Sequence, residues 1–335
     1  MVISRTPFRI SFFGGGTDYP AWYRKNGGMV LATTINKYCY LNVRFYPPFF
    51  GNKYRIAYSR IENCKTIDQI IHPSVRETLK FLKIHQGVEI HHDGDLPARS
   101  GLGSSSAFTV GLLHAVYALK GHMQSKQKLA KDSIYLEQKV LKETVGSQDQ
   151  ILASYGGFNL ITFHKDRQIS LKPITIPSKR IKELQNHLML FYTGIARTAS
   201  DIAKSYVGNI KDKEKQLDYM QELVTKAFEL INSRQDIQKL GKLLNDFWQI
   251  KRSLSTSVSN PKIDKLYQRA LSCGALGGKL LGAGGGGFIL LFVPQSHQAK
   301  VKKEFSKLIH VPFKFEHEGS QIIFYDQQEN YSFTK

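Results

Sequence analysis

Residues 96–107 read Leu-Pro-Ala-Arg-Ser-Gly-Leu-Gly-Ser-Ser-Ser-Ala, and this stretch decides the fold. A short alternating segment around Val88 and Ile90 precedes it, and the apolar segment Ala107 to Leu119 that follows has the length of a buried helix. Glycines let the backbone approach an anion, and the unpaired amides of a first helical turn favour phosphate. We therefore expect a phosphate-binding loop at the start of that helix, formed by Gly101, Leu102, Gly103, Ser104, Ser105 and Ser106.

The loop matches neither of two common nucleotide-binding patterns. It lacks the Gly-Lys-Ser/Thr ending of a Walker A motif, and Ser106 stands where a GxGxxG pattern has its third glycine. Its serines add hydroxyl groups that suit a phosphate or the metal ion bound to it. The structural alternative is a serine-rich N-cap on a buried helix.

A second segment places a carboxylate on an apolar surface. The helix expected over residues 126–144 carries Glu137 on a stripe that is otherwise apolar. An unpaired buried carboxylate is costly, so Glu137 needs either a divalent cation or an arginine or lysine. The phosphate loop in the same half of the chain favours Mg²⁺. Asp149, in Gly-Ser-Gln-Asp-Gln at 146–150, is either a turn residue or a catalytic base.

A third segment, residues 6–19, reads Thr-Pro-Phe-Arg-Ile-Ser-Phe-Phe-Gly-Gly-Gly-Thr-Asp-Tyr. Its first half alternates like a strand and puts Arg9 on the polar side, where we expect solvent exposure. A ligand can approach consecutive glycines closely, and an aspartate beside them can accept hydrogen bonds from sugar hydroxyls. A plain glycine-rich hairpin turn is the alternative. The substrate-binding candidates here are Gly15, Gly16, Thr17 and Asp18.

A fourth segment, residues 279–288, reads Lys-Leu-Leu-Gly-Ala-Gly-Gly-Gly-Gly-Phe. Its glycines satisfy GxGxxG, but the strand-like run Phe288 to Val293 follows where a dinucleotide site needs a helix, so we reject that reading. A flexible loop that closes over phosphates or substrate, with Gly284 and Gly285 as contacts, is the preferred interpretation over a structural hairpin.

Composition limits the class of protein. The 335 residues, 41% hydrophobic and 22% charged, are typical of a globular chain and exclude disordered, collagen-like and disulfide-scaffold proteins. The net charge of +20 favours anionic partners, namely nucleic acid, a membrane surface or phosphorylated small molecules. Three cysteines without a CxxC pair argue against disulfides and zinc. Without a signal peptide or a membrane-spanning run, we expect a cytoplasmic protein and no membrane partner.

The chain divides in two where its periodic pattern weakens. Residues 163–177 contain a charged run and two prolines, which are typical of a domain boundary. We expect an amino-terminal domain at 1–170 and a carboxyl-terminal domain at 171–335, with a closing pair of strands near residues 313–325. Strands and helices mix in both halves, which predicts the α+β class.

The four segments, in this order, resemble the motifs of the GHMP small-molecule kinases, a superfamily that includes galactokinase, homoserine kinase and mevalonate kinase. Residues 6–19, together with Phe-Tyr-Thr-Gly-Ile-Ala-Arg at 191–197 and Trp-Gln-Ile-Lys-Arg at 248–252, are similar to the branch that phosphorylates D-glycero-D-manno-heptose 7-phosphate at its anomeric hydroxyl. The resemblance implies a ribosomal-S5-like amino-terminal domain and a ferredoxin-like carboxyl-terminal domain, with the active site between them.

The resemblance also implies roles for individual residues. The serine that ligates Mg²⁺ aligns with Ser105, although the extra serine in this chain leaves Ser106 as an alternative. The metal carboxylate falls on Glu137, the catalytic aspartate on Asp149 and the arginine that assists it on Arg9. The loop 101–106 would hold ATP, and Asp18 would contact sugar hydroxyls.

The function expected from this resemblance is transfer of the ATP γ-phosphoryl group to the anomeric hydroxyl of heptose 7-phosphate, in a pathway to bacterial surface polysaccharide. An unphosphorylated sugar such as fucose, or another small alcohol, is the alternative acceptor. Arg197 and Lys251 are the first candidates to bind a sugar phosphate, and each has a solvated surface charge as its alternative. A nucleic-acid-binding protein fits the charge but leaves the glycine segments unexplained, so we expect no nucleic-acid partner. Homodimerisation stays open.

Overall fold

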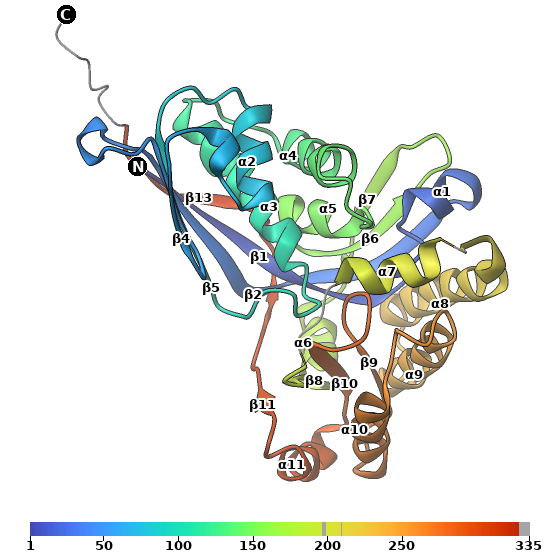
Figure 1. Cartoon of the computed structure of the whole chain (residues 1–335). Coiled ribbons are helices and arrows are strands. Elements are labelled where there is room, and N and C mark those ends of the chain that lie inside the picture. Colours follow the sequence, from blue (N-terminus) through green and yellow to red (C-terminus); the bar gives the residue numbers. More distant parts are fainter. Residues whose placement is uncertain (196–198, 209, 328–335) are drawn as a thin grey trace, which may run out of the picture.

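The computed structural model describes residues 1–195, 199–208 and 210–327, and it has two parts, each built on one sheet (Figure 1). The first sheet has nine strands, with a central order β13-β1-β2-β5-β3-β4 and with β6, β7 and β12 attached through β2 and β6. Its strands are β1 (Val2–Phe13), β2 (Gly28–Phe45), β3 (Tyr54–Ala57), β4 (Ile61–Cys64), β5 (Val88–Gly94), β6 (Phe158–Phe163), β7 (Ile169–Pro173), β12 (Phe315–Glu316) and β13 (Gln321–Tyr325).

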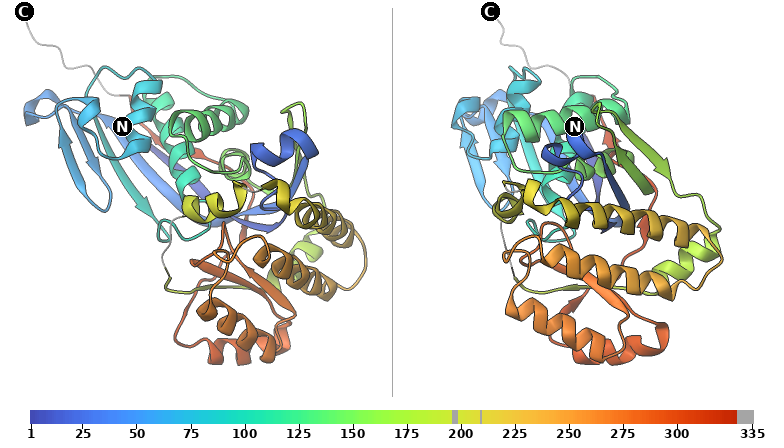
Figure 2. Two further views of the ribbon diagram at one scale, coloured as in Figure 1. Left: turned by 45° about the vertical axis from the view of Figure 1, so that its right-hand side comes forward. Right: turned by 90° about the vertical axis from the view of Figure 1, so that its right-hand side faces the viewer.

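The helices of the first part lie on one side of this sheet (Figures 1 and 2). The helix α3 (Ser104–Leu119) is apolar on nearly every side and buried along most of its length, as expected for a helix enclosed by a sheet and other helices. Around it lie α2 (Pro73–Phe81), α4 (Lys126–Tyr135), a π-helical segment η3 (Leu136–Val140) and α5 (Gln148–Tyr155), with α1 (Pro20–Asn26) and short 3₁₀ turns at Pro48–Phe50 and Ile67–Gln69.

The second part packs helices against a four-stranded sheet of order β11-β8-β10-β9. All five residues of β10 (Phe288–Phe292) are buried, which explains its unbroken apolar sequence. The other strands are β8 (Leu188–Tyr192), β9 (Gly277–Leu280) and β11 (Ile309–His310). The helices are α6 (Ser178–Asn186), α7 (Ala199–Val207), α8 (Glu214–Asn232), α9 (Gln238–Arg252), α10 (Pro261–Ser272) and α11 (Gln295–Glu304), with a 3₁₀ turn at Ile210–Lys213.

The domain boundary differs from the expected division at residue 170. The strand β7 belongs to the first sheet, so the change of part comes after Pro173. The chain also returns to the first sheet at its end, where β12 pairs with β2 and β13 pairs with β1 rather than with each other. The second part is therefore an insertion into the first, and 171–335 is not one domain. Strands of two and five residues carry no sequence signal for their partner.

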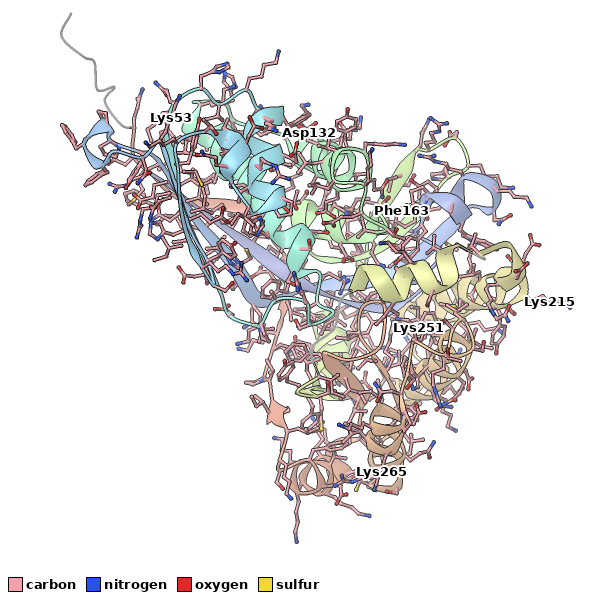
Figure 3. All side chains as sticks on the ribbon, in the orientation of Figure 1. Lys53, Asp132, Phe163, Lys215, Lys251 and Lys265 are labelled. Atoms are coloured by element: carbon pink, nitrogen blue, oxygen red, sulfur yellow. The ribbon has the colours of Figure 1, made fainter. Side chains whose placement is uncertain are left out.

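The two parts meet where β1 ends. The ring of Phe13 lies edge-on to that of Phe247 on α9, with their centroids 5.5 Å apart. Lys279 of β9 is buried between the sheets and donates to the carbonyl oxygens of Ser11 at 2.8 Å and Phe12 at 3.0 Å. Lys251 also lies at this junction (Figure 3). The predicted site residues of both parts are thus brought to one region.

Within residues 1–195, 199–208 and 210–327, no helix combines the length and the apolar composition that crossing a bilayer requires.

Candidate active site

The phosphate loop leads directly into α3. Gly103 occupies the N-cap position with φ +75°, in the left-handed region that favours glycine, and no side chain caps the helix. A Cβ atom on Gly103 would also lie 3.1 Å from Cγ of Arg9. The serine N-cap considered as an alternative is therefore not formed, because Ser104 Oγ accepts instead from the Arg99 amide at 3.1 Å. The first-turn amides of α3 stay available to an anion.

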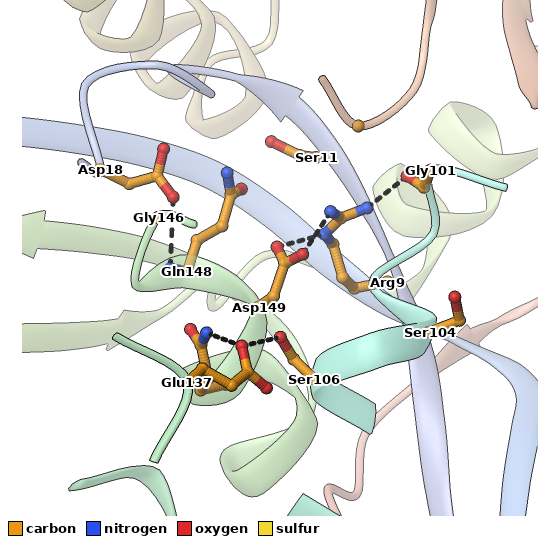
Figure 4. A network of polar contacts seen from close by, with 12 residues as sticks. Arg9, Ser11, Asp18, Gly101, Ser104, Ser106, Glu137, Gly146, Gln148 and Asp149 are labelled. Atoms are coloured by element: carbon orange, nitrogen blue, oxygen red, sulfur yellow. Dashed lines mark hydrogen bonds and ion pairs between the residues drawn. The ribbon is translucent and has the colours of Figure 1, made fainter. Parts of the chain in front are cut away.

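Glu137 lies in the π-helical segment at the end of α4. The segment is closed by a bond from the Leu141 amide to the Leu136 carbonyl at 2.8 Å, and such insertions are frequent at functional sites. Glu137 is fully buried, and its Oε2 accepts from Ser106 Oγ at 2.9 Å and from Gln150 Nε2 (Figure 4). Among the described residues its Oε1 has no hydrogen-bond partner, although the Thr109 hydroxyl also favours the charged form of the carboxyl and lowers its pKa. Burial raises the pKa of Glu137 to about 8, and the Glu143 carboxyl adds to the shift.

This environment fits a divalent cation. An unpartnered buried carboxylate oxygen next to a hydroxyl is a set of hard oxygen donors, which Mg²⁺ prefers. Among the residues that the structure describes, no group of three or more His, Cys, Asp or Glu side chains could hold a metal ion by itself. The remaining ligands would have to come from phosphate oxygens and water, as is usual for Mg²⁺ bound with a nucleotide.

The serine beside Glu137 is Ser106, not Ser105. Ser106 is buried and bonded to the carboxylate, whereas Ser105 is exposed on the first turn of α3. Successive residues on a helix point about 100° apart, so the two hydroxyls cannot both face Glu137. The structure thus brings Ser106, the alternative that the extra serine left open, next to Glu137. Which of the two serines ligates the metal stays a prediction.

Arg9 connects the phosphate loop with Asp149 (Figure 4). Its Nε and one terminal nitrogen donate to the two Asp149 oxygens at 2.7 and 2.6 Å, and its other terminal nitrogen donates to the Gly101 carbonyl at 2.6 Å. The expectation that Arg9 is solvent-exposed is wrong, because its side chain is only 7% exposed. The carboxylate of Asp149 is 24% exposed and so remains open to a ligand. This bidentate geometry is the strong form of the pair.

Asp18 joins the glycine turn to the loop before Asp149. Its Oδ1 accepts from the Gly16 amide at 3.0 Å and its Oδ2 from the Gln148 amide at 3.3 Å. Burial raises the pKa of Asp18, and the Asp149 carboxylate raises it further. A Cβ on Gly146 would lie 1.8 Å from Asp18 Oδ2, so only glycine allows this approach. Asp18 is thus a link between two loops, and its contact with sugar hydroxyls stays a prediction.

The other residues of the glycine turn divide into two kinds. Thr17 is fully buried, and its hydroxyl donates to the Gly14 carbonyl and accepts from the Met29 amide, so this side chain stabilises the turn and has no surface for a substrate. This corrects its assignment as a substrate residue. Gly16 has φ +123° and packs against Leu217 of α8, whereas Gly15 faces the side chains of Ser11 and Gln148.

The carboxyl-terminal glycine loop packs on the base of the phosphate loop. The Phe288 amide donates to the Ser100 carbonyl at 3.1 Å, and a Cβ on Gly287 would lie 2.0 Å from that oxygen. Gly284 has φ +117°, and the Gly285 amide donates to the Val258 carbonyl at 2.8 Å. The carboxyl-terminal glycine loop therefore lies beside the phosphate loop, as the sequence predicts.

Of the two candidates for binding a sugar phosphate, the structure describes only Lys251. Lys251 is buried and donates to the Gly282 carbonyl, so it lies beside the glycine loop instead of on the surface. Arg197 lies outside the described residues.

Sequence reasoning missed Lys279 as a residue of this region. Its ammonium group lies 4.5 Å from the centroid of the Phe247 ring, and burial lowers its pKa well below the usual value, with Lys251 and Arg9 lowering it further. The available signal was a lysine within the buried run Gly277–Leu281. A charged residue in such a run needs specific acceptors.

Comparisons with known proteins agree with this arrangement. The model of the GHMP kinases N terminal domain matches residues 69–157, and that of the GHMP kinases C terminal domain matches residues 224–310. A D-glycero-alpha-D-manno-heptose 7-phosphate kinase from Campylobacter jejuni is 30% identical over 91% of this chain and 93% of its own length.

Solved structures share the fold over nearly all of the chain. A D-glycero-D-manno-heptose 1-phosphate kinase from Bacteriodes thetaiotaomicron superposes with a TM-score of 0.78 at 21% identity, covering 99% of this chain and 100% of the other. A Lactococcus lactis galactokinase in complex with galactose gives a TM-score of 0.73 at 17% identity, covering 96% of this chain and 94% of the other. The predicted two-domain α+β fold is confirmed, and with a 30% identical relative matched along almost its whole length this chain belongs to the GHMP kinases.

Proposed function

We propose that this protein is an ATP-dependent sugar kinase. It transfers the γ-phosphoryl group of ATP to the anomeric hydroxyl of D-glycero-D-manno-heptose 7-phosphate and releases the 1,7-bisphosphate and ADP. The observation that carries this proposal is the Arg9–Asp149 pair, which lies between the phosphate loop and the glycine turn. The heptose 7-phosphate acceptor is supported by the name of the Campylobacter relative.

In this proposal the transfer needs positioning more than covalent chemistry, since phosphoryl transfer is in line between donor and acceptor oxygens. Asp149 orients the acceptor hydroxyl and accepts its proton, and the anomeric hydroxyl is more acidic than an ordinary alcohol. Arg9 fixes the carboxylate by two hydrogen bonds and offsets negative charge as the phosphoryl group moves. The first-turn amides of α3 bind the phosphates of ATP.

The residues that would hold Mg²⁺ are Glu137 and Ser106. Their donor set supports this, because Oε1 of Glu137 is buried without a partner next to the Ser106 hydroxyl. When bound, the ion supplies charge neutralisation on the phosphate oxygens. Glu137 must lose its proton to act as a ligand, and Gln150 keeps the carboxylate in place through its amide.

Two features support an acceptor that carries a phosphate of its own. The net charge is +20, and Lys251 lies beside the glycine loop of the second part. A cation beside a glycine loop at the site is suited to an anionic group of the substrate. A neutral sugar remains the competing acceptor, and the experiment below separates the two.

The test is ³¹P NMR of the purified protein with Mg-ATP and, in turn, D-glycero-D-manno-heptose 7-phosphate, the unphosphorylated heptose, fucose, galactose and mevalonate. An anomeric phosphate signal only with heptose 7-phosphate is the expected result. A product from a neutral sugar alone would keep the kinase activity and overturn the acceptor. Absence of ADP with every compound, despite ATP binding, would overturn the proposed activity.

A further inference from the structure

Two buried polar atoms near Asp149 have no hydrogen-bond partner among the residues that the structure describes. They are the Ser11 hydroxyl and Oε1 of Gln148, in residues that are only 4% and 8% exposed. The backbone amide of Gln148 donates to Asp18. A buried polar group without a partner is unfavourable, so such a pair is seldom kept without a reason.

The two side chains converge on one point. A Cβ atom on Gly15 would lie 3.5 Å from Ser11 Oγ and 3.5 Å from Gln148 Nε2, so both groups face the same side of the glycine turn. Figure 4 shows them between Asp18 and Arg9, on the side of Asp149 that faces the turn. Ser11 comes from β1 and Gln148 from the start of α5, which are the elements that also supply Arg9 and Asp149.

The charges around this point oppose one another. Asp18 and Asp149 lie on either side of it, but Arg9 pairs with Asp149 and the Lys279 ammonium donates to the Ser11 carbonyl, so the charges give no preference for an anionic group. A hydroxyl and a carboxamide both donate and accept hydrogen bonds, which suits the hydroxyls of a neutral polyol. ATP phosphates have their own place at the N-terminus of α3.

We propose that Gln148 and Ser11 form a specificity subsite that binds a non-reacting hydroxyl of the acceptor sugar. The proposal rests on the proposed function, since it places the acceptor against Asp149. It adds that the sugar carbons, not a phosphate of the acceptor, lie over the glycine turn. Gln148 adjoins Asp149 in the first turn of α5, so binding there fixes the reacting hydroxyl relative to the carboxylate.

The first test separates ligand binding from a structural role. Gln148→Met has a similar volume and keeps the backbone bond to Asp18, but it removes the amide whose Oε1 has no partner among the described residues. We expect its Tm without ligand to equal or exceed that of the wild type. The matched control is Gln138→Met, because the Gln138 amide donates to the Val145 and Gly146 carbonyls and to Ser147 Oγ, and its loss lowers the Tm. A Tm of Gln148→Met lowered as much as in the control would overturn the proposal.

The second test measures the acceptor. With heptose 7-phosphate as the probe, Gln148→Met and Ser11→Ala each raise the KM for the acceptor about tenfold, the loss of one hydrogen bond, and leave the KM for ATP within about twofold. Monodeoxy forms of the acceptor identify the hydroxyl, because its removal costs the wild type affinity but costs Gln148→Met nothing more. An unchanged acceptor KM in both variants would mean that only water occupies the subsite, and would overturn the proposal.

Failure of the proposed function gives a different result. In that case the wild type phosphorylates no sugar, while the Tm comparison of Gln148→Met with Gln138→Met still decides whether Gln148 has an internal role.

Discussion

Arg9 uses its guanidinium group on two separate segments of the chain. It donates to both oxygens of Asp149 and to the Gly101 carbonyl, and its backbone amide donates to the Leu102 carbonyl at 3.0 Å. A buried guanidinium with a single carboxylate keeps its charge paired. The same contacts fix the separation between the phosphate loop and Asp149, so one residue sets both the charge and the geometry of the site.

Asp149→Asn tests the base. Asn keeps an oxygen for Arg9 but cannot accept the proton, so we expect kcat to fall by about 10²–10⁴-fold. The rise in Tm on adding Mg-ATP should persist, because the nucleotide contacts other residues. Steady-state kinetics and a thermal-shift assay give the two quantities. Turnover near the wild-type value in a folded variant would contradict the assignment.

Ser106→Ala and Ser105→Ala are a matched pair for the metal site. Of these two serines, Ser106 is the one bonded to Glu137, so Ser106→Ala should raise the Mg²⁺ concentration for half-maximal activity by about tenfold. Ser105→Ala should have the smaller effect, since its side chain is exposed. The measurement is activity against free Mg²⁺ at saturating ATP. The opposite order would return the metal to Ser105.

At the level of elements, apolar patterns predict that a helix or strand exists better than they predict where a helix is interrupted. The segments expected at Ala107 to Leu119 and Phe288 to Val293 are α3 and β10 with slightly shifted ends. The single helix expected at 126–144 instead ends at Tyr135 and passes into the π-helical segment. Hydrophobic periodicity describes one segment only. It carries no information on the contacts that Glu137 of the π-helical segment makes with Ser106 and Gln150 of other elements.

The part of the site that rests on local sequence patterns could be predicted, and the part that rests on contacts between distant residues could not. The phosphate loop, Glu137 and the glycine segments are local signals in the sequence. The Arg9–Asp149 bond joins residues 140 positions apart, and alternation within β1 placed Arg9 in solvent. A side chain on the polar side of a strand can be buried by whatever packs over it, which here is the phosphate loop.

His114 of α3 makes the stability of the folded protein sensitive to acid. Its Nδ1 bonds to Ser320 Oγ at 3.0 Å, and burial lowers its pKa to about 4. Below pH 6.5 the unfolded chain takes up a proton at His114 that the folded chain resists. The contribution of neutral His114 to the free energy of unfolding is therefore complete above pH 6.5 and is lost as the pH falls towards 4. We expect a loss of about 2 kcal/mol from pH 7 to 5.

The measurement is urea unfolding at pH 7 and 5 for the wild type and His114→Gln. The variant cannot titrate at this position, so between pH 7 and pH 5 the free energy of unfolding should fall more in the wild type than in the variant. An equal loss of stability in both would show that His114 does not contribute.

On the scale of the whole molecule, the first sheet is assembled from the two ends of the described chain. Val2 pairs with Tyr325 and Arg5 with Gln321, while Phe315 pairs with Ile35 of β2. Thr6 and His114 both bond to Ser320, so the returning segment also contacts α3. The insertion of the second part between β7 and β12 is fixed to the first part by these contacts.

Ending the chain after Val311 removes β12 and β13 and leaves the second sheet intact. We expect this protein to lose cooperative unfolding or to aggregate, because β1 becomes an unpaired edge. A chain ending at Asp326 keeps both strands and serves as the control. Differential scanning calorimetry compares them. A cooperative transition at the wild-type Tm in the shorter chain would contradict the importance of the returning strands.

The pairing of β1 with β13 also governs how the protein is made. During synthesis β1 leaves the ribosome long before its outer partner β13, which emerges only when more than three hundred further residues have been translated. The strands β8 to β11 are contiguous in the intervening sequence, so their sheet can close while the first waits. The nascent chain therefore presents an open strand to the cell until β13 has emerged, and chaperones that recognise such edges have their longest access to it during that interval.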